Sequence, residues 1–182
     1  MLTLPHLRLW FATLALSLIL PTVTLAQEFT SFIGTFVGVA DETVDGETKQ
    51  RDMSVTVAET EEGFSVRWKS IAFKADGRVK EQEYTVEFVP SQRDNIFGSA
   101  MKRNVFGKSV ALDPLKGEPF VWARFVDDTF TVFSLFINEA GDYEMQEYHR
   151  TLAEGGLNLS FRRVRDGAAE KEITAFLKRQ DG

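Results

Sequence analysis

The sequence contains no cysteine, so no disulfide holds the fold and no thiol can act as a nucleophile. It has only two histidines, His6 and His149, and a zinc site with histidine and cysteine ligands is therefore not expected. Basic residues are also scarce: 21 Lys and Arg stand against 27 Asp and Glu, a net charge of −6. Because nucleic-acid-binding proteins usually carry a basic face, we expect no nucleic-acid partner. We likewise expect no metal ion and no cofactor.

A long hydrophobic run occurs only near the N-terminus, at residues 9–20. Arg8 precedes this run, and small residues before Gln27 offer a cleavage point. This order of features is typical of a secretory signal peptide. We therefore expect residues 1–26 to be a signal peptide and residues 27–182 to form a single domain that does not span a membrane. The protein is expected to be periplasmic or secreted, and the lack of cysteine favours a bacterial periplasm.

After the N-terminal segment, apolar residues recur at every second position, as in residues 53–57, 64–68, 84–88 and 157–161. Each such run predicts an antiparallel strand with one buried face and one exposed face. The dipeptides between the runs favour tight turns. These turns are Asp45-Gly46, Glu62-Gly63, Asp76-Gly77, Gly141-Asp142, Gly155-Gly156 and Asp166-Gly167.

Turns at such short intervals leave no room for crossover helices, so the sequence predicts an all-β, antiparallel up-and-down meander. Closing the meander of about 8–10 strands into a barrel would remove its two exposed edges. A two-sheet β-sandwich is the alternative. The expected strands cover residues 31–40, 52–58, 63–73, 80–89, 95–99, 119–126, 129–138, 142–152 and 157–165.

Two segments interrupt the alternation. Residues 90–118 contain scattered Pro and Gly, and they form either a lid over a functional site or a structural loop that covers one barrel end. Residues 170–179 fit either a helix face or a strand, and we favour a final strand that closes the barrel.

The chain has 16 phenylalanines, so the barrel interior is either a large filled core or an apolar cavity for one small ligand. Arg124 shares a strand face with Trp122, and an inward position would let its guanidinium hold the carboxylate of a ligand. The alternatives are an internal ion pair with Glu147 or Glu87, or a position at the barrel mouth. The predicted ligand-binding residues are Arg124, Trp122, Trp68, Phe64, Phe133, Tyr148 and Arg163.

No catalytic residues are expected. His149 is the only histidine after the signal segment, and no serine lies in a Gly-x-Ser-x-Gly elbow. We therefore predict a non-enzymatic exported barrel that binds a hydrophobic or amphipathic small molecule, including one that bears a carboxylate. The alternative is a structural or protein-interaction module of the cell envelope, which the two apolar faces of residues 129–137 favour. The oligomeric state is left open.

Two short stretches resemble a known superfamily: Gly34-Thr35-Phe36, and Leu159 to Arg163, which reads Leu-Ser-Phe-Arg-Arg. Together with the meander and the export signal, they look like the lipocalin and fatty-acid-binding-protein (calycin) barrels. Lipocalins typically carry a Gly-x-Trp motif early and an arginine on the last barrel strand that packs over the Trp ring. Phe36 stands at the position of that Trp, and either Arg162 or Arg163 is its counterpart. The resemblance implies a lipocalin-like barrel that carries a hydrophobic ligand.

Overall fold

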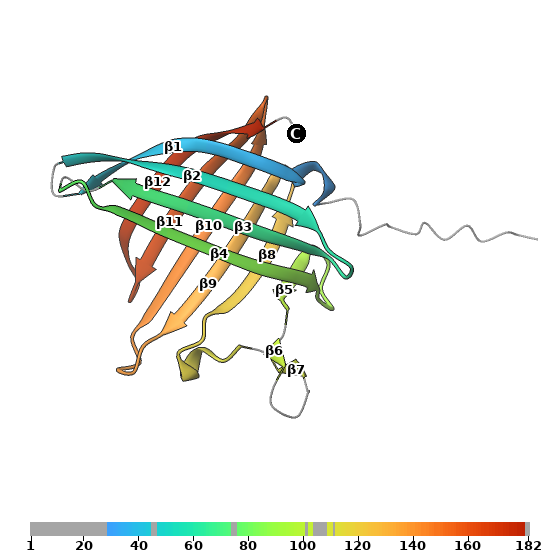
Figure 1. Cartoon of the computed structure of the whole chain (residues 1–182). Helices are drawn as coiled ribbons and strands as arrows, with labels where there is room; N and C mark the ends of the chain where they lie inside the picture. Colours follow the sequence, from blue (N-terminus) through green and yellow to red (C-terminus); the bar gives the residue numbers. More distant parts are fainter. Residues whose placement is uncertain are drawn as a thin grey trace, which may run out of the picture.

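The computed structural model of the chain is a closed barrel of ten antiparallel strands (Figure 1). The structure describes residues 29–180, except 45–46, 74–75, 101, 104–108 and 111. The predicted signal peptide, residues 1–26, lies outside this part of the chain. Around the barrel the strand order is β1-β12-β11-β10-β9-β8-β5-β4-β3-β2. The strands are thus joined almost entirely to their neighbours in sequence, as in an up-and-down meander.

The ten barrel strands are 4 to 13 residues long. They are β1 (Gly34–Val44), β2 (Glu47–Glu59), β3 (Phe64–Phe73), β4 (Val79–Pro90), β5 (Ile96–Ser99), β8 (Phe120–Val126), β9 (Thr129–Ile137), β10 (Tyr143–Ala153), β11 (Gly156–Arg165) and β12 (Ala168–Gln180). A separate two-stranded sheet and two 3-10 helices complete the described elements: β6 (Lys102–Arg103), β7 (Ser109–Val110), η2 (Thr30–Phe32) and η3 (Pro114–Lys116).

One end of the barrel is filled by phenylalanine rings. The η2 helix directs Phe32 onto Phe125 and Phe130, with ring centroids 5.5 and 5.8 Å apart. Phe64 contacts Phe125 and Phe130 in turn, at 5.6 and 5.5 Å. Such edge-to-face contacts add to the free energy of burying the rings. The seven buried rings of this group, which we call the phenylalanine core, are Phe29, Phe32, Phe64, Phe88, Phe97, Phe125 and Phe130.

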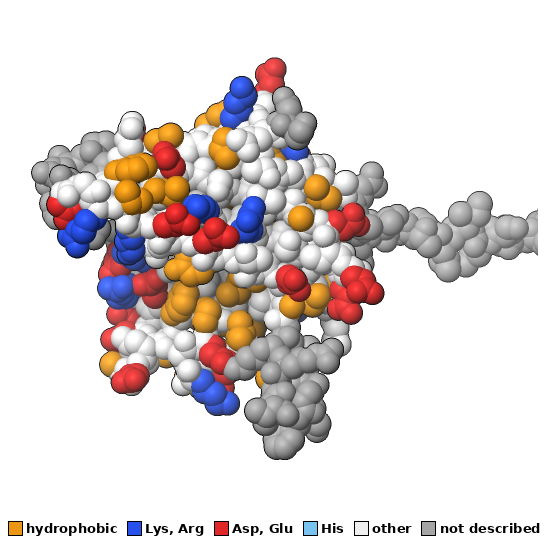
Figure 2. Space-filling model, in the orientation of Figure 1, with side chains coloured by type: hydrophobic (Ala, Val, Ile, Leu, Met, Phe, Trp, Pro, Cys, Tyr) orange, Lys and Arg blue, Asp and Glu red, His pale blue; other side chains and the backbone are white. Residues whose placement is uncertain are grey.

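The barrel wall is weakest beside β4. This strand pairs with β5 only through Phe88, Val89 and Pro90, because β5 has just four residues. Within the described residues, the rest of β4 therefore has no strand partner on that side. Several large hydrophobic side chains are exposed nearby, including Val79 (58% exposed) and Tyr84 (52% exposed). Figure 2 shows hydrophobic side chains at the surface below β4.

The structure confirms the all-β fold class and the closed barrel, and the two-sheet sandwich is not formed. Residues 170–179 lie within β12, which pairs with both β11 and β1 and so closes the wall, as predicted. Strands β1–β4 cross in front of β8–β12 at a steep angle in Figure 1. Residues 90–118 contain β5, the small β6–β7 sheet and η3. Within the described residues, no helix is both long and apolar enough to cross a bilayer.

Candidate ligand site

Arg150 is the most unusual residue of the barrel interior. It lies on β10 opposite Phe130 of β9 and Leu159 of β11, and only 1% of it is exposed. Its guanidinium lies 5.5 Å from the ring centroids of both Phe130 and Tyr148, and Nη1 donates a hydrogen bond to the carbonyl oxygen of Tyr148 at 3.3 Å. Its buried Nε atom has no hydrogen-bond partner among the residues that the structure describes. No carboxylate of the described residues forms an ion pair with this arginine.

Burial changes the ionisation of both polar groups at this point. Desolvation lowers the pKa of Arg150 to about 10, so the guanidinium is still charged at neutral pH. Desolvation also raises the pKa of Tyr148 to about 12, so its hydroxyl stays protonated. That hydroxyl donates a hydrogen bond to Oε1 of Gln146 at 2.8 Å. The interior therefore presents a cation and a neutral hydroxyl donor, both on one wall.

A layer of aromatic side chains lies next to Arg150 on the side away from the phenylalanine core. Tyr148 contacts Phe161 of β11 at 4.7 Å and Trp68 of β3 at 5.6 Å. Trp68 in turn contacts Tyr84 of β4 at 5.7 Å. Strands β3 and β10 are not neighbours in the sheet order, so the contact between Trp68 and Tyr148 bridges opposite walls of the barrel. We call Trp68, Tyr84, Tyr148 and Phe161 the aromatic layer.

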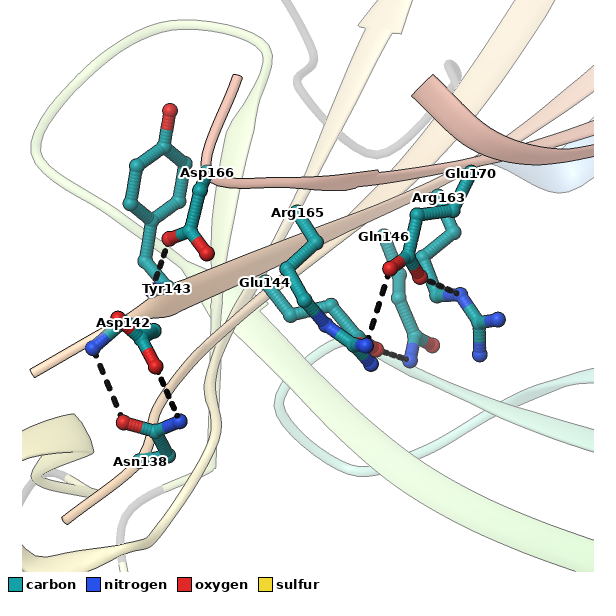
Figure 3. A network of polar contacts seen from close by, with 9 residues as sticks. All are labelled: Asn138, Asp142, Tyr143, Glu144, Gln146, Arg163, Arg165, Asp166 and Glu170. Carbon is teal, nitrogen blue, oxygen red and sulfur yellow. Dashed lines mark hydrogen bonds and ion pairs between the residues drawn. The ribbon is translucent and has the colours of Figure 1, made fainter. Parts of the chain in front are cut away.

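Beyond the aromatic layer, the inner wall becomes polar and charged (Figure 3). Gln146 donates to Glu144 at 2.5 Å, and Arg165 donates to the other oxygen of Glu144 at 2.8 Å. Glu170 pairs with Arg163 at 3.2 Å and with Arg165 at 2.9 Å, from the position where the β11–β12 register shifts. Partial burial raises the pKa of Glu144, but the hydrogen bonds from Gln146 and Arg165 outweigh this effect and lower it.

The turn at the start of β10 is tied to the same edge of the barrel. Asn138 accepts a hydrogen bond from the backbone N–H of Asp142 at 2.9 Å, and its side-chain amide donates to the Asp142 carboxylate at 3.0 Å. Asp166 accepts from the backbone N–H of Tyr143 at 3.1 Å. These contacts join the β9–β10 and β11–β12 turns, and they fix the rim beside the charged wall (Figure 3).

Four of the predicted site residues lie on the inside of the barrel. Phe64 is fully buried and belongs to the phenylalanine core, whereas Trp68 and Tyr148 belong to the aromatic layer. Arg163 lies opposite Gln146 on the polar wall. Of these four residues, Tyr148 and Trp68 contact each other, and Tyr148 also contacts Arg150.

An interior position for Arg124, Trp122 and Phe133 is wrong. Along β8, the inward residues Val121, Ala123 and Phe125 are buried, and Arg124 is exposed on the opposite face. Trp122 stacks on Phe133 of β9 on that same outer face, at 4.9 Å and 12°. Both faces of β8 carry apolar residues, so alternation alone could not say which face points inward.

The structure also excludes the alternative of an internal ion pair between Arg124 and Glu87 or Glu147. Glu87 and Glu147 both lie on outward positions, next to the inward residues Phe88 and Tyr148. The Glu147 Oε2 atom lies 3.1 Å from Nε2 of His149, so the partner of this carboxylate is a histidine and not an arginine. The two carboxylates therefore do not share an interior cavity, and neither forms an internal ion pair with Arg124.

The sequence reasoning missed Arg150, although a signal for it exists. Tyr148, Arg150 and Leu152 occupy alternate positions of the strand, and the intervening side chains of Glu147, His149 and Thr151 are all polar. The first set is the more apolar face and therefore the inner one. A charged residue in the middle of that face is a candidate for function because an unpaired buried charge is costly.

The arginine that the lipocalin resemblance implies is also a different residue. Arg162 lies on the outer face near Glu172, and Arg163 lies on the polar wall, so neither packs on Phe36. Arg179 of β12 does, with its guanidinium 4.5 Å from the centre of the Phe36 ring. Its two terminal nitrogens donate to the carbonyl oxygens of Ile33 and Ser31, at 2.6 and 2.9 Å. The expected arginine-over-ring contact therefore exists and comes from the last barrel strand, as the resemblance implies, but the arginine is Arg179.

A separate groove of about 360 Å³ lies on β1, β2 and β3. Its lining includes Val39, Asp52 and Lys69, and none of the predicted site residues contributes to it. The barrel interior around Arg150 is thus a different place, and we take it as the candidate site.

Fold and interior together define the class of protein: a closed, up-and-down antiparallel β-barrel with an arginine buried in its interior. No known protein-family profile matches the chain, and no curated protein matches it in sequence. The chain is similar to a solved structure of the S-type phycobiliprotein lyase CPES from Guillardia theta. The identity is 9%, the match covers 82% of this chain and 89% of that chain, and the TM-score is 0.30. At these values the likeness adds nothing to the barrel that the strand pairing defines.

Proposed function

We propose that this chain is a non-enzymatic barrel that binds an amphipathic small molecule through its carboxylate. The observation that supports this function is the charged guanidinium of Arg150, which is buried, lacks an ion-pair partner among the described residues, and has an unsatisfied Nε. An uncompensated buried charge destabilises a protein by several kcal/mol. A carboxylate would supply the missing counter-charge and accept two parallel hydrogen bonds from Nε and a terminal nitrogen.

The surroundings of the guanidinium favour a ligand with an apolar body. Phe130, Leu159 and Tyr148 pack around the arginine, and Trp68 closes the layer from the opposite wall. Apolar pockets with a few placed polar groups are the usual form of small-molecule sites. Membership of the lipocalin and fatty-acid-binding superfamily is part of this proposal, and the contact between Arg179 and Phe36 supports it.

Export is also part of the proposal, on the basis of the N-terminal sequence. The charged residue, the apolar run and the small residues before Gln27 support a periplasmic or secreted carrier. N-terminal sequencing of the protein recovered from outside the cytoplasm should give Gln27 as the first residue. Recovery of the whole chain in the cytoplasm would remove this part of the proposal.

Thermal unfolding with paired ligands tests the binding function. Dodecanoate and 2-naphthoate are compared with their amides, which keep the apolar body and lack the charge. At least one acid should raise the melting temperature of the wild type and of Arg124→Met, the matched control on the outer face. The same acid should leave the melting temperature of Arg150→Met unchanged. The amides should not change the melting temperature of any of the three proteins. Saturation at a hundred times the Kd is worth about 2.7 kcal/mol, or about 5–10 °C for a domain of this size.

Two results would overturn the proposal. One is that neither acid shifts the wild type at any concentration up to its solubility limit. The other is that the shift persists in Arg150→Met, because the carboxylate would then bind elsewhere.

The outer face of β8 and β9 supports a second candidate, an interaction module that self-associates. Phe120 is 42% exposed and contacts Trp122, which itself stacks on Phe133. Exposed aromatic groups of this kind are enriched at protein interfaces. Sedimentation equilibrium should give a dimer that Trp122→Ser dissociates. A monomer at every concentration would remove the support for this candidate.

A further inference from the structure

Strand β4 forms the lower margin of the β1–β4 layer (Figure 1), and much of its length is an exposed edge. It pairs with β3 on one side, but with β5 on the other side only over residues 88–90. No strand of the described residues pairs with residues 79–87 on that other side, and we call this stretch the β4 edge. All its side chains are exposed except those of Gln82 and Val86. Such an edge presents backbone groups on which another strand can pair.

The direction of these backbone groups follows from the pairing of β4. In an antiparallel sheet, the N–H and C=O of one residue point to the same neighbouring strand, and those of the next residue point to the other. The carbonyl oxygen of Glu87 accepts a hydrogen bond from the backbone N–H of Ala100, on the β5 side. The β3–β4 register runs along the whole stretch without a shift. The residues whose backbone groups point away from β3 are therefore Val79, Glu81, Glu83 and Thr85.

Charge on the outer face indicates what a strand at this edge should carry. Nζ of Lys69 on β3 lies 2.7 Å from Oε1 of Glu81, and Nη1 of Arg67 lies 3.8 Å from Oε1 of Glu83. Glu87 adds a third carboxylate to the β4 row. Opposite charges on neighbouring strands stabilise a sheet, and like charges destabilise it. A second copy of β4 would set glutamates opposite glutamates in any register that covers residues 81–85, so a basic strand fits better.

The inner face of the β4 edge favours apolar neighbours. Tyr84 lies opposite Trp68 on this face, with the ring centroids 5.7 Å apart, yet 52% of Tyr84 is exposed. Val86, the next residue on the same face, is only partly buried. Successive side chains of a strand point to opposite faces. A strand with basic residues on its outer face would therefore place its other side chains beside Tyr84, where apolar groups would bury exposed apolar surface.

We propose that the β4 edge binds an extended peptide segment of a partner protein, antiparallel to β4, in which Lys or Arg alternates with apolar residues. The basic side chains lie opposite Glu81 and Glu83, and the apolar ones lie beside Tyr84. Addition of a strand to a sheet edge is an established mode of peptide recognition, in which backbone hydrogen bonds supply affinity and side chains supply specificity. Arg150 takes no part in this surface, so the proposal is independent of the ligand site.

Fluorescence anisotropy with two labelled peptides tests the charge pattern. The peptide Lys-Val-Lys-Val-Lys-Val-Lys, blocked at both ends, should bind the wild type at least about tenfold more tightly than its counterpart with Glu in place of Lys. Glu81→Lys/Glu83→Lys should reverse this preference. Glu154→Lys/Glu172→Lys changes the net charge equally at other exposed positions, and it should keep the affinity for the lysine peptide within about threefold. Both variants should fold, because exposed ion pairs contribute little to stability.

Methylation of the peptide backbone separates strand pairing from charge attraction, because it leaves every side chain and charge in place. In the proposed pairing the lysines lie opposite Glu81 and Glu83, so their N–H groups point to β4 and the valine N–H groups point away. Methylating two lysine nitrogens should weaken binding to the wild type at least about tenfold. Methylating two valine nitrogens should change it less than about threefold.

Three results would overturn the proposal. The first is that the lysine peptide shows no saturable binding to the wild type below about 1 mM. The second is that Glu81→Lys/Glu83→Lys binds the lysine peptide as tightly as the Glu154→Lys/Glu172→Lys control does. The third is that the lysine-methylated peptide binds no more weakly than the valine-methylated one, and this comparison uses only the wild-type protein.

Discussion

Replacing Arg150 with methionine should make the ligand-free protein more stable. The buried, unpaired guanidinium costs several kcal/mol in lost hydration. Its two contacts with aromatic rings return about 1 kcal/mol each, and its hydrogen bond to the carbonyl oxygen of Tyr148 returns about 2 kcal/mol. Methionine has a similar length, no charge and a flexible side chain that packs well against rings.

The expected gain is about 1–3 kcal/mol in the free energy of unfolding, the amount found when other buried charges are replaced by apolar residues. For a domain of this size, the melting temperature should rise by about 3–9 °C. Urea denaturation gives the free energy directly, provided that the dependence on urea is the same in both proteins. Arg124→Met on the outer face is the matched control, and its effect should stay within about 0.5 kcal/mol.

A loss of 1 kcal/mol or more in Arg150→Met would refute this reasoning. The guanidinium would then be a net stabilising part of the core, and its burial would need no ligand to explain it. A gain in stability together with loss of carboxylate binding would identify a residue that is retained for function at a cost in stability.

Three further predictions concern the rest of the barrel. Arg179→Gln removes the contact with the Phe36 ring and two hydrogen bonds to the η2 segment. Urea denaturation should show a free energy of unfolding that is lower by about 1–3 kcal/mol. An unchanged urea midpoint would show that the contact does not stabilise the fold. The pKa of Glu144 is lower in the folded state than its ordinary 4.5, so its contribution to stability is present above that value and is lost as the pH falls through the folded pKa. Glu144→Gln should therefore flatten the loss of stability between neutral and acidic pH, and parallel curves for both proteins would contradict this. The pKa of Tyr148 is raised to about 12, so the stability that this group contributes is present below pH 10 and is lost as the pH rises toward 12. Tyr148→Phe should remove that alkaline loss, as followed by circular dichroism, and an identical alkaline transition in the variant would count against it.

The fold could be predicted from the sequence because the alternation of side chains is strong and the turns are clear. Residues 64–68 illustrate this point: Phe64 and Val66 are fully buried, and Arg67 is exposed. The final strand was harder, since residues 170–179 fit both a helix and a strand. The pairing with β1 favours the strand, because only a strand can form backbone hydrogen bonds with the edges of both β1 and β11.

The site was harder to predict than the fold because it depends on which face of a strand points inward. In β8 the sequence Phe-Val-Trp-Ala-Arg-Phe-Val is apolar on both faces. The register with β9 sets Ala123 opposite Val132 on the inside, and it thereby turns Arg124 to the outside. In β10 the alternation that places Tyr148 inside the barrel also places Arg150 inside, but a charged residue is not expected in an apolar interior, and Arg150 was therefore missed. Tyr148 and Trp68 were predicted correctly as interior residues, but not the contact between them across the barrel.

The most direct test of carboxylate binding is the NMR signal of the Arg150 Nε–H group, assigned by its absence in Arg150→Met. This N–H has no acceptor in the described part of the ligand-free protein. Titration with the acid that raises the melting temperature should move the proton resonance downfield in proportion to occupancy, because a charged acceptor then binds this group. A resonance that stays fixed while the same acid saturates the protein would contradict the proposed role of Arg150.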